Sequence, residues 1–145
     1  MNIIGIDPGA NGGIAMVTPN NEWTADRFPK DREPRSVKKL FNSYVRGNKC
    51  RVYIELVHAM PMDARSSAFK FGMNYGIWLG LSAYHVTTKI TPQTWQSIYG
   101  ELSKEKTKRK NELKKIASDI SGVPATLATA DAILIANYGL KRKEE

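Results

Sequence analysis

The chain has 145 residues and one cysteine, Cys50, so we expect a single domain with a real core, without an internal disulfide or a multi-cysteine zinc site. No apolar run approaches the ~18 residues that span a bilayer, and no signal-peptide pattern is present. We therefore expect a cytoplasmic protein without a membrane partner. The formal net charge of +8 favours a polyanionic partner, most simply nucleic acid.

The N-terminal stretch combines a short buried strand with an acid and a glycine-rich turn. Residues 3–6 are apolar or small and predict a strand, Asp7 stands where it stops, and residues 14–17 return as a second strand. Glycines at 9, 12 and 13 allow a tight turn. Asp7 is open to two interpretations. It is a turn residue before a proline, or a buried carboxylate whose charge is balanced by a cation, a metal ion or hydrogen-bond donors.

The segments that follow alternate between strands and helices, as in an α/β domain. A third strand at 22–28 follows the turn at 19–21, so the first three strands predict an antiparallel meander. An amphipathic helix at 36–45 precedes a fourth strand, 51–55, which again ends in an acid, Glu55. Further on we expect a long helix at 64–84, a strand at 86–90, a short helix at 93–99, a basic helix at 103–120 and an apolar helix at 129–138.

Two strands of this pattern end in a carboxylate. Asp7 and Glu55 lie side by side if their strands are adjacent and parallel, and the helix between them supplies the crossover that parallel strands require. The C-terminal edge of such strands is where α/β folds place ligands. Asp131 is the only acid within the apolar last helix. It is interpreted as helix-dipole stabilisation in a first turn, or as the third member of one cluster, which we favour.

Three clustered carboxylates indicate a particular chemistry. They repel one another unless a cation neutralises them, and oxygen ligands suit Mg²⁺ or Mn²⁺. A two-metal site activates water and clamps a phosphodiester, so the natural reaction is phosphodiester hydrolysis. The chain has neither a Walker A lysine loop nor a GxSxG motif, and its two histidines are too few for a histidine-rich site.

The helix at 103–120 carries most of the clustered positive charge. At 100° per residue, Lys106 and Lys110 continue the inward stripe that Leu113 and Ala117 form. These two lysines either reach over the sheet edge toward bound phosphates or snorkel past the margin of the core. The basic residues of the run are Lys104, Lys106, Lys108, Arg109, Lys110, Lys114 and Lys115.

The long helix at 64–84 carries three glycines four residues apart, Gly72, Gly76 and Gly80, which share one face. Each costs about 1 kcal/mol in a helix interior. Their spacing predicts that another backbone packs closely there. That backbone belongs to the sheet or to the same helix of a second subunit.

The chain resembles the RuvC-type Holliday junction resolvases, in particular the small phage-encoded branch. The resemblance is carried by IGIDPGANGGIA at 4–15, YIELVHAMP at 53–61, SSAFKFGMNYG at 66–76, TPQTWQ at 91–96 and TADAILIANYG at 129–139. It implies that residues 1–145 form one ribonuclease H-like nuclease domain. Its five-stranded mixed sheet would join an antiparallel meander of the first three strands to parallel strands, with helices on its flanks.

The same resemblance implies a homodimer that binds four-way and other branched DNA junctions and cuts them with Mg²⁺, with Mn²⁺ as a substitute. The family's metal-binding catalytic acids fall on Asp7, Glu55 and Asp131. Its phosphate-binding lysines fall within Lys104, Lys106, Lys108 and Lys110, of which Lys106 and Lys110 are preferred. The position that wedges into the junction is His58, with Phe69 a second candidate.

The chain departs from the family at one place. The family has another Asp or His one helical turn before the last acid, where this chain has Ala128 and Leu127, which cannot bind metal. Asp63 compensates, or the activity is weak, or one ion is held mainly by the scissile phosphate. Asp63 is otherwise a solvated loop residue. Two alternative functions therefore stay open: a junction-binding protein with weak or lost cleavage, and a ribonuclease H-fold nuclease for RNA or hybrids.

Overall fold

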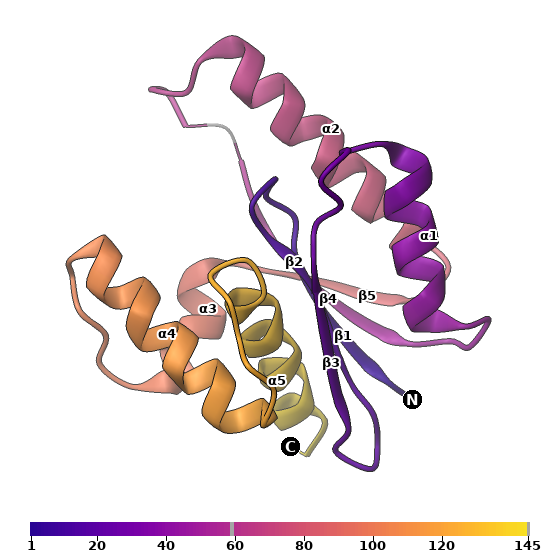
Figure 1. The fold of residues 1–145 in the computed structure, drawn as a ribbon, viewed down its shortest axis with the longest axis vertical. Coiled ribbons are helices and arrows are strands. Elements are labelled where there is room, and N and C mark those ends of the chain that lie inside the picture. The colour runs from indigo at the N-terminus through magenta and orange to yellow at the C-terminus, as the bar shows by residue number, and fades with distance from the viewer. Residues whose placement is uncertain (59, 145) are drawn as a thin grey trace.

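A computed structural model describes residues 1–58 and 60–144. Its centre is a twisted sheet with helices on both faces (Figure 1). The strands follow the spatial order β3-β2-β1-β4-β5. Their bounds are β1 Ile3–Asp7, β2 Gly13–Val17, β3 Trp23–Arg27, β4 Arg51–Glu55 and β5 Val86–Ile90. The predicted meander is confirmed, and so is the mixed sheet, because β4 and β5 run parallel to β1.

The pairing of β1 decides where the acids lie. Asp7 stands opposite Gly13 of the antiparallel β2, and on the other side Ile6 is in register with Ile54 of the parallel β4. Asp7 and Glu55 each follow one of these paired residues, so both strands end in a carboxylate at the same edge of the sheet. This is the arrangement expected for parallel neighbours joined by a crossover.

The helices form two layers (Figure 1). Those over one face, α1 and α2, enclose a core that contains Phe41, Trp78 and Ile54. Those over the other face, α3 to α5, enclose a second core around α5. The bounds are α1 Pro34–Val45, α2 Arg65–Ser82, α3 Pro92–Gln96 followed by a 3₁₀ turn Ser97–Tyr99, α4 Lys106–Ser121 and α5 Ala130–Glu144.

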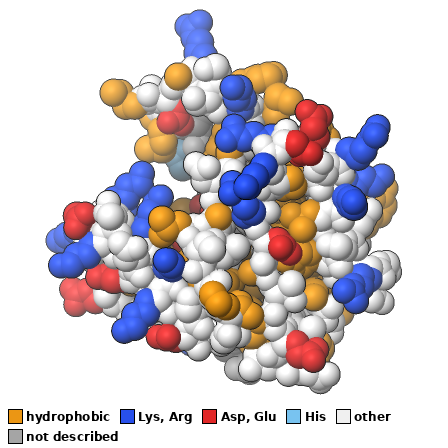
Figure 2. Space-filling model, in the orientation of Figure 1, with side chains coloured by type: hydrophobic (Ala, Val, Ile, Leu, Met, Phe, Trp, Pro, Cys, Tyr) orange, Lys and Arg blue, Asp and Glu red, His pale blue; other side chains and the backbone are white. Residues whose placement is uncertain are grey.

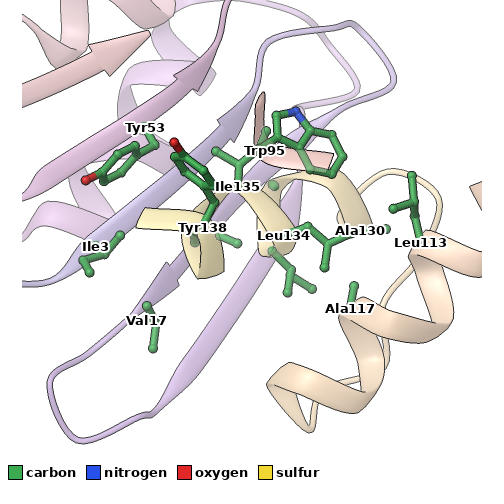
Figure 3. Packing of buried hydrophobic residues seen from close by; sticks show 14 of the residues in the cluster. Ile3, Val17, Tyr53, Trp95, Leu113, Ala117, Ala130, Leu134, Ile135 and Tyr138 are labelled. Carbon is green, nitrogen blue, oxygen red and sulfur yellow. The ribbon is translucent and has the colours of Figure 1, made fainter. Parts of the chain in front are cut away.

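The last helix, α5, packs directly on the sheet (Figure 3). A Cβ on Gly5 of β1 would collide with the backbone of Ala132 and Ala136, so the glycine allows helix and strand to come very close. Likewise a Cβ on Gly139 would collide with the ring of Tyr53, so the contact between α5 and the sheet continues past the predicted helix end at 138. This close packing holds the first turn of α5 over the end of β1.

The glycine face of α2 differs from one of the two expectations. A Cβ on Gly72, Gly76 or Gly80 would meet nothing within 4 Å in the described part of the chain. The stripe of α2 that is buried against the sheet is instead Asn74, Trp78 and Ser82. The interpretation that the sheet packs on these glycines is therefore wrong, because the glycines lie on the side of the helix that faces away from the sheet.

Cys50 is fully buried just before β4. No helix in residues 1–58 and 60–144 has both the length and the apolar character needed to cross a membrane.

Candidate active site at the strand ends

Asp7 lies in a turn shaped around its carboxylate. The Gly9 N–H donates a hydrogen bond to Asp7 Oδ1 at 3.1 Å, and the turn is closed by a bond from the Gly12 N–H to the Gly9 carbonyl oxygen. A Cβ on Gly12 would lie 2.7 Å from Asp7 Oδ2 and would collide with the Asp7 backbone oxygen. The glycines of this turn therefore make room for the acid. The Gly9 bond is also that of a turn-forming aspartate, so both interpretations of Asp7 describe part of its geometry.

The three candidate acids influence one another's protonation. Burial raises the pKa of Asp131 to about 7, and the Asp7 charge adds to this. Burial also raises the pKa of Glu55 to about 7, followed by the repulsion of Asp7 and, more weakly, of Asp131. Burial raises the pKa of Asp7 as well, although the Gly9 hydrogen bond and the positive charge of Lys110 oppose the rise. Such mutual effects place the three carboxylates in one electrostatic unit.

The donor set suits a hard divalent cation in its chemistry, because it offers carboxylate oxygens that gain from a neutralising charge. Within the described residues, no three His, Cys, Asp or Glu side chains are placed to hold one metal ion as they stand. Glu55 is engaged elsewhere, since its Oε2 accepts a hydrogen bond from the buried Trp95 indole N–H at 2.7 Å. The candidate ligands remain Asp7, Glu55 and Asp131, but their side chains would have to move closer together around an ion, and the Trp95 bond holds Glu55.

A cavity of about 630 Å³ opens beside two of these acids. Asp7 and Asp131 line it on the sheet side, and residues of α2, α4 and the 29–33 loop complete it. Figure 2 shows a hollow between the projecting end of α2 and α4, with Lys and Arg side chains around it. Its lining residues are Asp7, Gly9, Ala10, Asn11, Gly12, Arg32, Ser67, Lys70, Phe71, Met73, Asn74, Lys110, Leu127, Ala130 and Asp131.

The predicted DNA-binding lysines occupy different places. Lys110 lines the cavity, and its positive charge opposes the rise in pKa that burial causes at both Asp7 and Asp131. Lys104 lines a second cavity of about 450 Å³. Lys106 and Lys108 are exposed and line neither cavity. Of the four predicted lysines, the structure thus brings only Lys110 to the cavity that Asp7 and Asp131 line.

The remaining predicted residues lie outside the cavity. His58 is exposed in the loop after β4, and Phe69 is 70% exposed on α2. Asp63 is exposed, and its Oδ2 accepts a hydrogen bond from the Met60 N–H at 2.8 Å. Asp63 is not among the cavity residues, so the structure does not bring it to the acids. Leu127, by contrast, lines the cavity, but its apolar side chain offers no ligand to a metal ion.

Several cavity residues were missed by sequence reasoning. Arg32, Lys70, Phe71 and Asn74 lie on a loop and a helix whose orientation toward the acids depends on tertiary packing. Asn74 alone left a local signal, because it is an amide within the otherwise buried stripe of a helix. Trp95 was also visible within TPQTWQ, but its bond to Glu55 was not predicted.

Comparisons with known proteins give a match at the level of structure. The chain is similar to Thermus thermophilus RuvC in complex with a Holliday junction substrate, with a TM-score of 0.66 and 17% identity over 99% of this chain and 95% of the other. It is also similar to a second Thermus thermophilus RuvC structure, with a TM-score of 0.59 and 17% identity over 99% and 97% of the two chains. No family model matches the sequence, and no curated protein matches it. The chain therefore has a RuvC-like, ribonuclease H-like fold.

Proposed function

We propose that this chain is a metal-dependent, structure-selective DNA endonuclease that cleaves four-way and other branched junctions by phosphodiester hydrolysis. The observation that carries the proposal is the electrostatic unit of Asp7, Glu55 and Asp131, with Lys110 beside it, at one edge of a ribonuclease H-like sheet. The likeness to a RuvC structure in complex with a Holliday junction substrate supports the choice of DNA substrate.

The acids have raised pKa values, and this fits a role as ligands of Mg²⁺ or Mn²⁺. When bound, such an ion polarises the phosphodiester and activates water. Asp7 would hold it from the glycine turn, Asp131 from the first turn of α5 and Glu55 from the end of β4. Trp95 holds one Glu55 oxygen in a fixed place, and this limits how the carboxylate can turn toward the ion.

The cations around the cavity would hold the DNA backbone. The charge of Lys110 acts directly on the acids. Arg32, from the 29–33 loop, and Lys70, from α2, line the same cavity. Lys104, Lys106 and Lys108 extend this surface along the start of α4. Contacts of this kind read the backbone and its shape, so binding should depend strongly on salt and weakly on sequence.

The glycine side of α2 is the surface through which two subunits would associate. Gly72, Gly76 and Gly80 leave open space there, which lets a second helix approach closely. A homodimer would present two active sites to the two strands that are cut, while His58 and Phe69 would contact the junction centre.

A second function is favoured by one specific observation. Leu127 and Ala128 give no metal ligand, and the acids among the described residues do not form a ready three-ligand site. A protein that binds junctions but cleaves them weakly would have this arrangement.

The proposal is tested by incubating the protein with labelled four-way junction, linear duplex and RNA:DNA hybrid, with and without Mg²⁺. We expect tight binding of the junction and Mg²⁺-dependent cleavage of the junction alone. Tight binding without cleavage would establish the junction-binding alternative. Cleavage of the hybrid in preference to the junction would establish the ribonuclease alternative, and junction binding no tighter than duplex binding would contradict both junction functions.

A further inference from the structure

Asn74 is a buried polar side chain without a protein partner. It is only 8% exposed, and in the described part of the chain its carboxamide has no hydrogen-bond partner. Trp78 Nε1 and Ser82 Oγ, farther along the same stripe of α2, also lack a partner, but neither residue lines the cavity. Asn74 does line it. The amide atoms of Asn74, unlike those of Trp78 and Ser82, are not fully enclosed, so the carboxamide is open to the cavity and available to hydrogen-bond a ligand there.

The lining of the cavity is chemically mixed. Its charged members are the acids Asp7 and Asp131 and the cations Lys110, Arg32 and Lys70. Its apolar and polar neutral members include Phe71, Met73, Leu127 and Asn74. Phe71 lies next to the glycine turn that carries Asp7, since its ring is 3.9 Å from a Cβ placed on Gly9. An aromatic ring is therefore directly beside the turn that holds this carboxylate.

We propose that this cavity receives one unstacked nucleobase of the strand being cut, and that Asn74 reads its edge. The inference rests on the proposed endonuclease function and specifies its substrate. A nucleotide combines the same chemistries as the lining of the cavity, because it joins an anionic phosphate to a flat apolar base that has a polar edge. The phosphate only accepts hydrogen bonds, whereas a base edge offers both donors and acceptors, as the carboxamide does. Enzymes that place a base in a pocket first take it out of the stack.

Base reading by Asn74 predicts a cleavage preference at one nucleotide next to the scissile phosphate. A good amide contact to a base edge discriminates by roughly 10-fold or more against the wrong base. Junction affinity should change little between sequences, because the backbone contacts supply most of it.

The first test uses four-way junctions in which each nucleotide beside the exchange point is varied in turn. The variants are Asn74→Ala, Asn74→Leu, which keeps the side-chain volume without the amide, and the control Asn42→Ala on the exposed side of α1. We expect the wild type and Asn42→Ala to prefer one base by about 10-fold or more. Both Asn74 variants should cleave the junctions with each of the four bases at rates that differ by no more than about 2-fold, with unchanged junction affinity and Mg²⁺ requirement.

A second readout needs no cleavage. With Ca²⁺ in place of Mg²⁺, 2-aminopurine is placed at each nucleotide around the exchange point, and its fluorescence reports unstacking. We expect one position to brighten on binding the wild type, and to brighten less with Asn74→Leu. An unchanged base preference in both Asn74 variants would overturn the proposal. So would a raised Mg²⁺ requirement with intact preference, which would make Asn74 a metal ligand.

The outcome also separates this inference from the function on which it rests. A wild type that cuts junctions with no base preference and brightens no single position refutes the base pocket but leaves the endonuclease intact. A wild type that binds junction no better than duplex refutes the endonuclease itself, and the base pocket with it.

Discussion

Replacing Asp131 by asparagine should stabilise the metal-free protein at pH 8. The pKa of Asp131 is raised from 3.8 to about 7, chiefly by burial and then by the charge of Asp7. The unfolded chain ionises this group near pH 4, whereas the folded protein keeps it protonated until about pH 7. The folded state of the wild type therefore loses stability as pH rises from about 4 to about 7, and the loss is complete above pH 7.

The size of the effect follows from the shift. Each unit of pKa shift corresponds to about 1.4 kcal/mol, so the ionised Asp131 lowers the free energy of unfolding at pH 8 by roughly 4 kcal/mol at most. At pH 5 the raised pKa of Asp131 lowers the free energy of unfolding by less than half of the amount at pH 8. An asparagine side chain at this position has a similar shape and no charge, so Asp131→Asn should be more stable than the wild type by about 2–4 kcal/mol at pH 8.

The assay is urea unfolding in EDTA at pH 5 and pH 8, with Asp119→Asn, an exposed acid of α4, as the control. Saturating Mg²⁺ at pH 8 should reverse the order, because the ion binds the folded wild type and neutralises the charge that burial penalises. The reasoning is refuted if Asp131→Asn is no more stable than the wild type at pH 8, or if its advantage is the same at both pH values.

Three further outcomes are expected. Lys110→Ala should lower junction cleavage by about 10- to 100-fold, because it removes the cation that would hold the scissile phosphate beside the acids, while Lys115→Ala on the same helix should change cleavage by less than about 2-fold. Gly12→Ala should abolish cleavage and lower the unfolding free energy by several kcal/mol, since its Cβ collides with the Asp7 backbone; normal cleavage and stability would contradict the packing. Gly76→Arg should place a bulky charge in the proposed contact between subunits and separate the homodimer into monomers, which halves the mass measured by sedimentation velocity. Asn42→Arg on α1 should leave the mass unchanged.

The fold was predictable because its signals are local. The strands 51–55 and 86–90 were predicted with their observed bounds, and the other elements differ mainly at their ends. The meeting of Asp7 and Glu55 also followed from sequence, since parallel neighbours joined by one helix must end at the same edge. Helical periodicity placed Lys106 and Lys110 on the stripe that continues into the core through Leu113, but of these two lysines only Lys110 lines the cavity.

The rest depends on contacts between distant segments. The face on which Gly76 lies could not be chosen from spacing alone, since the glycine stripe and the Asn74 stripe share the same four-residue period. The bond between Trp95 and Glu55 joins residues 40 positions apart. Arg32 lines the cavity from a loop in which its own φ is +55°. The sequence around Arg32 does not predict this left-handed conformation.

Asp7 stands at the centre of the proposed metal-dependent cleavage site. The most direct test of this role measures single-turnover cleavage of a labelled four-way junction by the wild type and by Asp7→Asn over a range of Mg²⁺ concentrations, together with junction affinity in Ca²⁺. We predict Mg²⁺-dependent cleavage by the wild type, and cleavage at least about 100-fold slower by Asp7→Asn with its junction affinity kept. Cleavage by Asp7→Asn at the wild-type rate would contradict the assignment.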